Sequence, residues 1–174
     1  MRLLLVLFLL PALLQAQVKK PIDKKKSSIT YSMNHLLHAW DGTSKELNGV
    51  VQFNTKNEIE KVAIVSKVSA FDSKSSNRDS HMLEVTEAIK FPNISFYTTA
   101  LTETKKGEWD VKGILQFHSV NKEISFKSTS KENNGVTEMV GNFIFLLEDF
   151  KIDRPSFMLK PVDNEVKIRF EIFF

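Results

Sequence analysis

The chain has 174 residues and no cysteine, which excludes a disulfide-stapled fold and a cysteine nucleophile. Its length suits one hydrophobic core. Hydrophobic residues make up 42% of the chain and include 14 phenylalanines, which is enough to fill such a core. The formal net charge of +3 comes from lysines spread along the chain, with one cluster at Lys24-Lys25-Lys26. That distribution is typical of a solvated surface, and we expect no nucleic-acid partner.

Residues 1–16 have the organisation of a secretory signal peptide. Arg2 provides the positive start, residues 3–14 form an apolar run, and Ala16 is a small residue after which a signal peptidase can cut. The run is too short for a stable transmembrane helix, and no later segment approaches that length. We therefore expect a periplasmic or secreted protein without stable membrane insertion; a buried N-terminal helix or an uncleaved anchor is the alternative.

Apolar and polar residues alternate along most of the chain after a polar lead-in at residues 17–26. The pattern is clearest at the C-terminus, where Val166, Ile168, Phe170, Ile172 and Phe174 alternate with mostly charged residues. Turn signals such as Asn133-Asn134-Gly135 join neighbouring segments as hairpins, and Asp41-Gly42 is predicted as a turn or bulge. Residues 27–174 are therefore predicted to form an all-β domain, an eight-stranded antiparallel barrel whose closure removes exposed strand edges.

One helix is predicted to interrupt the strands at about residues 77–90. Met82, Leu83, Val85 and Ile89 recur at helical spacing, Asn77 or Asp79 is placed as an N-cap, and Pro92 follows the end. The polar cluster of residues 77–81 at its start has two interpretations. It is either a lid over a binding site or a helix cap whose Arg78 and Asp79 pair with neighbouring loops.

The apolar side chains on the inward face of the strands give the strongest indication of function. An eight-stranded barrel is just wide enough to be filled by side chains or to hold one small ligand, and periodicity does not separate these cases. If the barrel is hollow, the predicted ligand-binding residues are those on the inward face of its strands: Met33, Val51, Phe53, Ile64, Phe96, Phe117, Phe126, Phe143, Phe145 and Phe170.

Catalytic motifs are missing from the sequence, and we predict that the protein is not an enzyme. It has no Gly-x-Ser-x-Gly elbow and no phosphate-binding glycine-rich loop. His35 and His38 lie three apart in an expected strand, so they should face opposite sides and not share a metal unless a bulge intervenes. No metal site is predicted.

Two other classes of protein remain as alternatives. A metal-dependent envelope enzyme would use His35, His81 and His118, because histidine is the commonest metal ligand. A small outer-membrane barrel would share the signal peptide, the strands and the terminal Phe174. Lysine and glutamate on the outward face argue against that barrel, since a lysine or arginine at the bilayer midplane costs about 2–4 kcal/mol.

Three stretches, in this order, resemble the YceI-like family of lipid- and polyisoprenoid-binding proteins. The first joins Phe71-Asp72-Ser73, residues 77–83 and residues 91–96; the second joins residues 111–115 and 118–124; the third is residues 150–156. The match runs from about Ser27 to the C-terminus. Ser119 and Asn121 stand where glycine and threonine are usual, and Lys151 replaces a glycine. The first strand reads His35-Leu36-Leu37-His38 and not the commoner single-histidine form.

This resemblance implies a lipocalin-like extended barrel that is exported to the periplasm. It also implies that the interior holds an amphiphilic lipid, a polyisoprenoid or an isoprenoid-quinone-like molecule, for which the protein is a carrier or buffer. It implies no catalytic residues and no required cofactor beyond that lipid. Ligand identity is not carried over, and the oligomeric state, including a homodimer, is left open.

Overall fold

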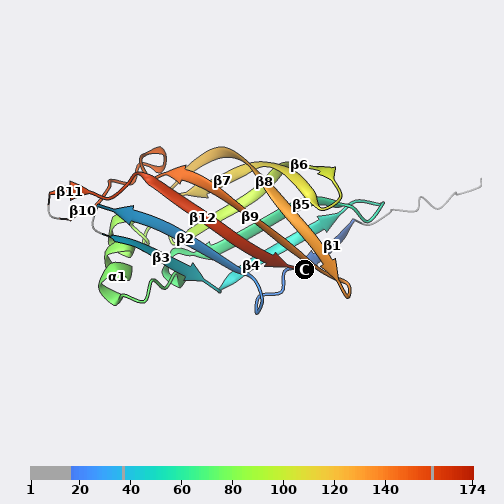
Figure 1. The fold of residues 1–174 in the computed structure, drawn as a ribbon, viewed down its shortest axis with the longest axis horizontal. Coiled ribbons are helices and arrows are strands. Elements are labelled where there is room, and N and C mark those ends of the chain that lie inside the picture. The colour runs from blue at the N-terminus through green and yellow to red at the C-terminus, as the bar shows by residue number, and fades with distance from the viewer. Residues whose placement is uncertain (1–16, 37, 158) are drawn as a thin grey trace, which may run out of the picture.

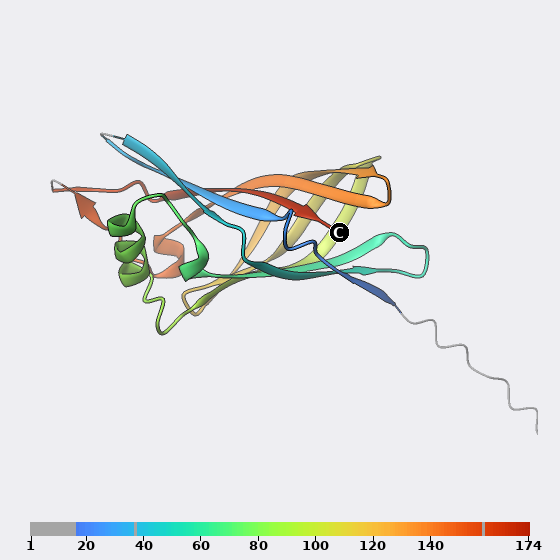
Figure 2. The same cartoon turned by 90° about the horizontal axis from the view of Figure 1, so that it is seen from below.

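The computed structural model describes residues 17–36, 38–157 and 159–174. The predicted signal peptide lies outside these residues. Most of the strands form one long curled antiparallel sheet, and an α-helix packs at one end of it (Figures 1 and 2). Among the described residues, no helix combines the length and the apolar character needed to span a membrane.

Ten strands make up the main sheet, in the order β1-β4-β5-β6-β7-β8-β9-β12-β2-β3. Their bounds are β1 Val18–Pro21, β2 Ser28–His35, β3 His38–Ser44, β4 Leu47–Phe53, β5 Ile59–Lys67, β6 Asn93–Lys105, β7 Glu108–Phe117, β8 Val120–Asn133, β9 Val136–Leu146 and β12 Glu165–Phe173. A separate small hairpin pairs β10 (Ser156–Phe157) with β11 (Lys160–Pro161). The helices are α1 (Ser76–Val85) and the short 3-10 turns η1 (Val68–Ala70) and η2 (Glu148–Phe150).

The curl of the sheet follows from the path of residues 38–53. This segment pairs with β2 over its first half, as β3, and with β5 over its second half, as β4. One continuous piece of chain therefore belongs to both sides of the sheet, which must bend round to accommodate it. The Ser44 and Ser66 hydroxyls, both buried, are hydrogen-bonded at 2.9 Å where β3 passes β5.

The predicted fold class is confirmed, but within the described residues the main sheet has ten strands and not eight. One additional strand is β1, which lies in the segment predicted as a lead-in and pairs with β4. The other is β3, which contains the Asp41-Gly42 pair that was predicted as a turn or bulge. Gly42 instead pairs with Tyr31 across the β2–β3 ladder, and a Cβ at this position would collide with the Tyr31 ring. Gly42 therefore makes room for an aromatic ring inside a regular strand.

Helix α1 is shorter than the predicted 77–90 segment, and its N-cap is Ser75, not Asn77 or Asp79. It ends at Val85 because the Thr86 hydroxyl donates to the Met82 carbonyl at 2.6 Å and Glu87 adopts a left-handed backbone with φ of 46°. Ile89 consequently lies beyond the helix and is fully exposed.

The apolar core has two parts along the length of the barrel. The part near α1 is built around Phe150, whose ring lies 5.2 Å from that of Phe145 and 5.9 Å from that of Phe117. The part at the opposite end, which we call the distal core, contains Leu47, Val51, Phe53, Trp109 and Ile172 among others. Its members are almost fully buried, at 9% exposure or less.

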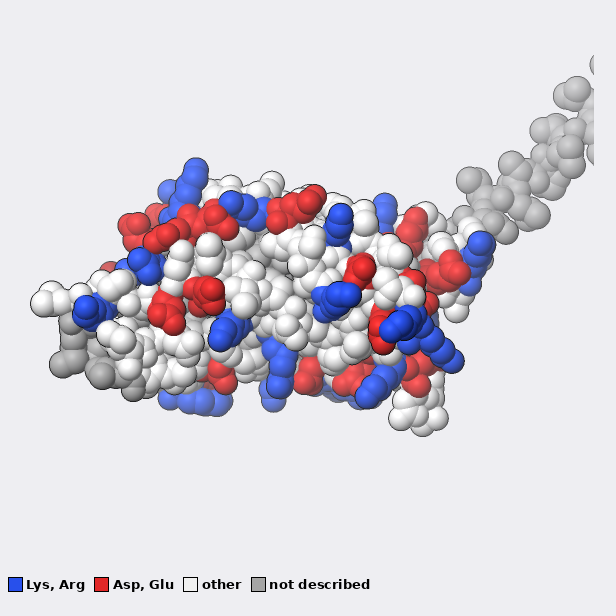
Figure 3. All heavy atoms as spheres, turned by 45° about the horizontal axis from the view of Figure 1, so that its top comes forward, with Lys and Arg blue, Asp and Glu red and all other residues white. Residues whose placement is uncertain are grey.

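Charged side chains of both signs are interspersed over the face shown in Figure 3. Several of them pair at the surface, for example Lys122 with Asp149 at 3.0 Å and Lys127 with Asp110 at 3.6 Å. Exposed pairs of this kind contribute little stability. The mixture of signs is consistent with the solvated surface expected from the scattered lysines.

Candidate ligand-binding cavity

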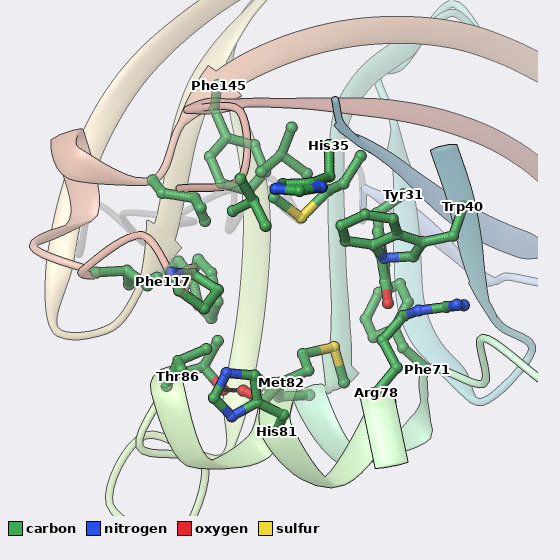
Figure 4. Close-up of a pocket in the computed structure, with 18 of the residues that line it drawn as sticks. Tyr31, His35, Trp40, Phe71, Arg78, His81, Met82, Thr86, Phe117 and Phe145 are labelled. Atoms are coloured by element: carbon green, nitrogen blue, oxygen red, sulfur yellow. Dashed lines mark hydrogen bonds between the residues drawn. The ribbon is translucent and has the colours of Figure 1, made fainter. Parts of the chain in front are cut away.

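A cavity of about 400 Å³ lies at the α1 end of the barrel, and we call it the larger cavity (Figure 4). Its walls come from β2, β3, β6, β7, β9 and β12, from η1 and α1, and from residues 152–162. Most of the lining side chains are apolar, including Phe71, Met82, Phe117, Phe145 and Ile168. Both its volume and its lining fall in the range of small-molecule sites, about 300–1,000 Å³ and mainly hydrophobic.

A few polar side chains interrupt the apolar lining of this cavity, among them His35, Arg78 and His81 (Figure 4). His38, His81 and Ser156 are its exposed lining residues, so they mark the opening to solvent, which we call the cavity mouth. Half-buried Arg78 also lines the cavity, with its guanidinium 5.2 Å from the centre of the Trp40 ring (Figure 4). A guanidinium over an indole face is a favourable cation–π arrangement that holds both groups in place.

The polar cluster at residues 77–81 combines features of both interpretations given to it. Arg78 Nη1 donates to the Ser73 carbonyl at 3.3 Å, and the Asp79 carboxylate accepts from the Ser73 amide at 3.1 Å, so both residues pair with the preceding loop. Arg78 and His81 also line the larger cavity. They lie three apart on α1 and therefore share one face of the helix, which covers the cavity.

His35 and His38 are also brought together, and the prediction that they face opposite sides was wrong. They are direct partners in the β2–β3 ladder, with ring centroids 6.2 Å apart, and both line the larger cavity. The turn between the two strands reverses the chain, so they are a cross-strand pair and not two positions on one strand. His35 is buried, and its Nε2 lies 3.3 Å from the Lys160 carbonyl.

His118 lies apart from these histidines. Its Nδ1 is 2.8 Å from the Phe150 carbonyl, and its Nε2 is 2.8 Å from the Glu87 carboxylate, so it ties the end of the helical segment to η2. It does not line the larger cavity. The histidines of the metal-enzyme alternative are thus divided between two places, and in the described ranges no three His, Cys, Asp or Glu side chains are grouped to hold a metal ion.

Tyr31 stands in the wall of the larger cavity, and burial raises the pKa of its hydroxyl above the ordinary 10.0, an effect that nearby Asp79 reinforces. The unfolded chain therefore releases this proton near pH 10, whereas the folded chain retains it to higher pH. We expect the free energy of unfolding to fall as the pH rises above about 10. In urea unfolding measured over this pH range, the free energy of unfolding of Tyr31→Phe should fall less steeply with pH than that of wild type.

Tyr97→Phe is the matched control for this pH series, since Tyr97 is 40% exposed and lines neither cavity. It should keep the wild-type decline. An equal alkaline decline in wild type and Tyr31→Phe would show that burial of the Tyr31 hydroxyl does not contribute.

A second cavity, of about 80 Å³, lies deeper in the barrel, and we call it the smaller cavity. Phe71, Ile94 and Ile168 line both cavities and form the boundary between them. Six residues of the distal core line the smaller cavity: Val62, Ile64, Val111, Met139, Ile172 and Phe174. The order along the barrel is therefore mouth, larger cavity, boundary and then the smaller cavity, whose walls belong in part to the distal core.

The structure divides the predicted ligand-binding residues among three places. Met33, Phe117 and Phe145 line the larger cavity, and Ile64, Phe96, Phe126, Phe143 and Phe170 line the smaller one. Val51 and Phe53 line neither cavity and pack in the distal core. Sequence reasoning gave the start of α1 as a lid in only one of two interpretations, and it missed the contribution of residues 152–162. The i, i+3 spacing of Arg78 and His81 beside apolar Met82 was the available signal for the helix.

Known proteins resemble this chain in sequence over part of its length. A UPF0312 protein of Pseudomonas fluorescens is 33% identical over 111 residues, which are 62% of this chain and 55% of that protein. A UPF0312 protein of Pseudomonas putida is 31% identical over the same shares. The chain thus matches about half the length of these curated relatives.

Solved structures share the fold at low sequence identity. BcnA of Burkholderia cenocepacia superposes with a TM-score of 0.79 at 16% identity, covering 88% of this chain and 99% of BcnA. A polyisoprenoid binding domain from Saccharophagus degradans, described as implicated in plant cell wall breakdown, gives 0.75 at 12% identity, covering 91% and 98%. The YCEI protein of Campylobacter jejuni gives 0.68 at 19% identity, covering 81% and 88%.

Family membership rests on a match that is longer than any of these pairwise sequence alignments. The model of the YceI-like domain matches residues 21–174, from the end of β1 to the last residue. That span contains both cavities, α1 and every strand of the curled sheet except most of β1. The chain therefore belongs to the YceI-like domain family.

Proposed function

We propose that this protein binds one amphiphilic isoprenoid lipid, a polyisoprenoid or an isoprenoid-quinone-like molecule. The apolar tail occupies the larger cavity, and the polar head lies at the cavity mouth near Arg78, His38 and His81. The observation that carries the proposal is the cavity of about 400 Å³, whose lining is mainly apolar and whose exposed lining residues, His38, His81 and Ser156, are polar. The polyisoprenoid binding domain from Saccharophagus degradans, which shares the fold, supports the choice of ligand class.

The physical basis of binding is removal of the tail from water. Each methylene group transferred into an apolar site contributes about 0.8 kcal/mol, so a tail of several isoprene units can be held without any polar contact. Among the described residues, no Asp or Glu lines the larger cavity, whereas Arg78 and three histidines do. The mouth thus offers hydrogen-bond donors and suits a head group with acceptor oxygens.

We infer a role in carriage or buffering of the lipid and not in its chemical conversion. Binding needs only the apolar walls and the polar mouth, and His118 is engaged by Phe150 and Glu87 away from the cavity. The predicted export signal would place this carrier in the periplasm or outside the cell, with a mature chain that begins at Gln17.

Native mass spectrometry of protein purified from a cell envelope extract tests these proposals together. The expected spectrum contains the chain from Gln17 onward, with one bound molecule that organic extraction removes and releases as an isoprenoid lipid. Protein that carries no adduct and does not take up added farnesol would overturn the binding proposal. A mass that includes residues 1–16 would overturn the export proposal and leave the binding proposal intact.

A further inference from the structure

Four phenylalanine rings meet in the interior of the barrel, just beyond the boundary of the larger cavity. We call Phe96, Phe126, Phe143 and Phe170 the phenylalanine cluster; all four line the smaller cavity. Phe126 is at its centre, with ring centroids 5.1 Å from Phe143, 5.6 Å from Phe96 and 5.6 Å from Phe170. These separations are typical of favourable aromatic pairs, so the cluster is held together by its own contacts.

Two of the rings, those of Phe170 and Phe96, lie directly over glycine residues. Phe170 is the ladder partner of Gly141, and a Cβ on Gly141 would lie 2.6 Å from the Phe170 ring. A Cβ on Gly113 would likewise collide with the Phe96 ring. Each ring therefore lies against a stretch of sheet without a side chain, and the cluster occupies the lumen from β6, β8, β9 and β12 together.

The space on the two sides of the boundary is very unequal. The volume per molecule in liquid water is about 30 Å³. The larger cavity, of about 400 Å³, therefore has room for roughly thirteen groups of that size. The smaller cavity of about 80 Å³ holds fewer than three. Val51 and Phe53 of the distal core are buried and line neither cavity. A linear tail that enters from the mouth thus runs out of room at the phenylalanine cluster.

We propose that the phenylalanine cluster limits the bound lipid to a short isoprenoid tail of about three units and that Phe126 is the residue that sets this limit. The inference rests on the proposed function and adds the substrate class, short-tailed amphiphiles, to it. Longer tails must leave their last units in water at the mouth or displace packed aromatic rings. Phe126 has this role because it contacts the other three rings of the cluster.

A tail-length series tests the limit directly. Geraniol, farnesol and geranylgeraniol have two, three and four isoprene units, and their binding can be followed by the fluorescence of Trp40, which lines the larger cavity. For wild type we expect farnesol to bind at least about tenfold tighter than geraniol, since one more unit is buried, and geranylgeraniol to gain less than about threefold. In Phe126→Ala, geranylgeraniol should bind at least about tenfold tighter than farnesol.

Phe126→Leu provides the same test with a smaller loss of packing, in case the alanine variant does not fold. It should shift the preference in the same direction by a smaller factor. Phe53→Leu is the matched control, because Phe53 is an inward phenylalanine of the distal core that lines neither cavity. It should keep the wild-type order of affinities.

Two results would overturn the limit while leaving the proposed function standing. One is a wild-type protein that binds geranylgeraniol tenfold tighter than farnesol. The other is a folded Phe126→Leu variant with the wild-type length preference. A different result, in which none of the three alcohols binds wild type or any variant, would overturn the proposed function itself.

Discussion

Replacing Met33 with tryptophan is expected to lower the affinity for farnesol by about two orders of magnitude. Met33 lies on β2 and lines the larger cavity, where a bulkier ring would occupy volume that the tail needs. Exclusion of three to four carbon groups removes about 2.5–3 kcal/mol of burial, which corresponds to about a hundredfold in affinity. Titration of farnesol against both proteins by isothermal calorimetry measures the loss.

Ser32→Trp separates loss of volume from disturbance of β2. Ser32 is the neighbour of Met33 on the same strand and lines neither cavity, so its substitution adds the same ring on the outer face. This variant should bind farnesol as wild type does. Wild-type affinity in a folded Met33→Trp protein would mean that the tail is not held in the larger cavity.

Replacing Phe150 with alanine is expected to destabilise the fold by about 3–5 kcal/mol. Phe150 is 1% exposed and packs behind Phe117 and Phe145, two residues that line the larger cavity. Its ring therefore supports the cavity wall, and its removal leaves a void that the surrounding strands cannot easily fill. For a domain of this size the loss corresponds to a lowering of Tm by roughly 6–20 °C in a thermal unfolding scan.

Phe173→Ala is the matched control for Phe150→Ala. Phe173 is on β12 between the buried Ile172 and Phe174, so alternation places its half-buried ring on the outer face. Its loss should cost about 1 kcal/mol. Similar losses in the two variants would show that the wall behind Phe117 and Phe145 is not a main source of stability.

The sequence predicted the class of fold well because strand alternation is a local property. Which residues face inward follows from a period of two, and the inward positions of Phe117, Phe145 and Phe170 were identified in this way. The position of a residue along the barrel axis depends on the register between neighbouring strands. The sequence of one strand does not determine that register. This is why Val51 and Phe53 were grouped with cavity residues although they pack in the distal core.

Turn signals were the weaker part of the sequence interpretation. Gly42 was predicted to mark a turn or bulge, but it accommodates the Tyr31 ring within β3. The actual reversal lies between His35 and His38, where no Gly, Asn, Asp or Pro is present. A glycine that relieves a clash and a glycine that permits a left-handed turn have the same signature in a single sequence, so only the paired strand distinguishes them.

Helix α1 shows why the mouth was only partly predicted. Arg78 and His81 were recognised as a polar cluster, yet their role depends on Trp40, which comes from β3 and places its ring beneath the Arg78 guanidinium. That contact joins segments nearly forty positions apart in the sequence. Spacing within one helix shows that two side chains share a face, and tertiary packing decides what that face covers.

A crystal structure of the protein with bound farnesol tests the central claim most directly. The expected density is one continuous tail in the larger cavity, with its hydroxyl at the mouth near Arg78 and its end past Phe71, Ile94 and Ile168, against the phenylalanine cluster. The phenylalanine cluster should be unmoved. Density for farnesol only on the outer surface, or ordered water throughout the larger cavity in its presence, would contradict the assignment of the barrel interior as the lipid site.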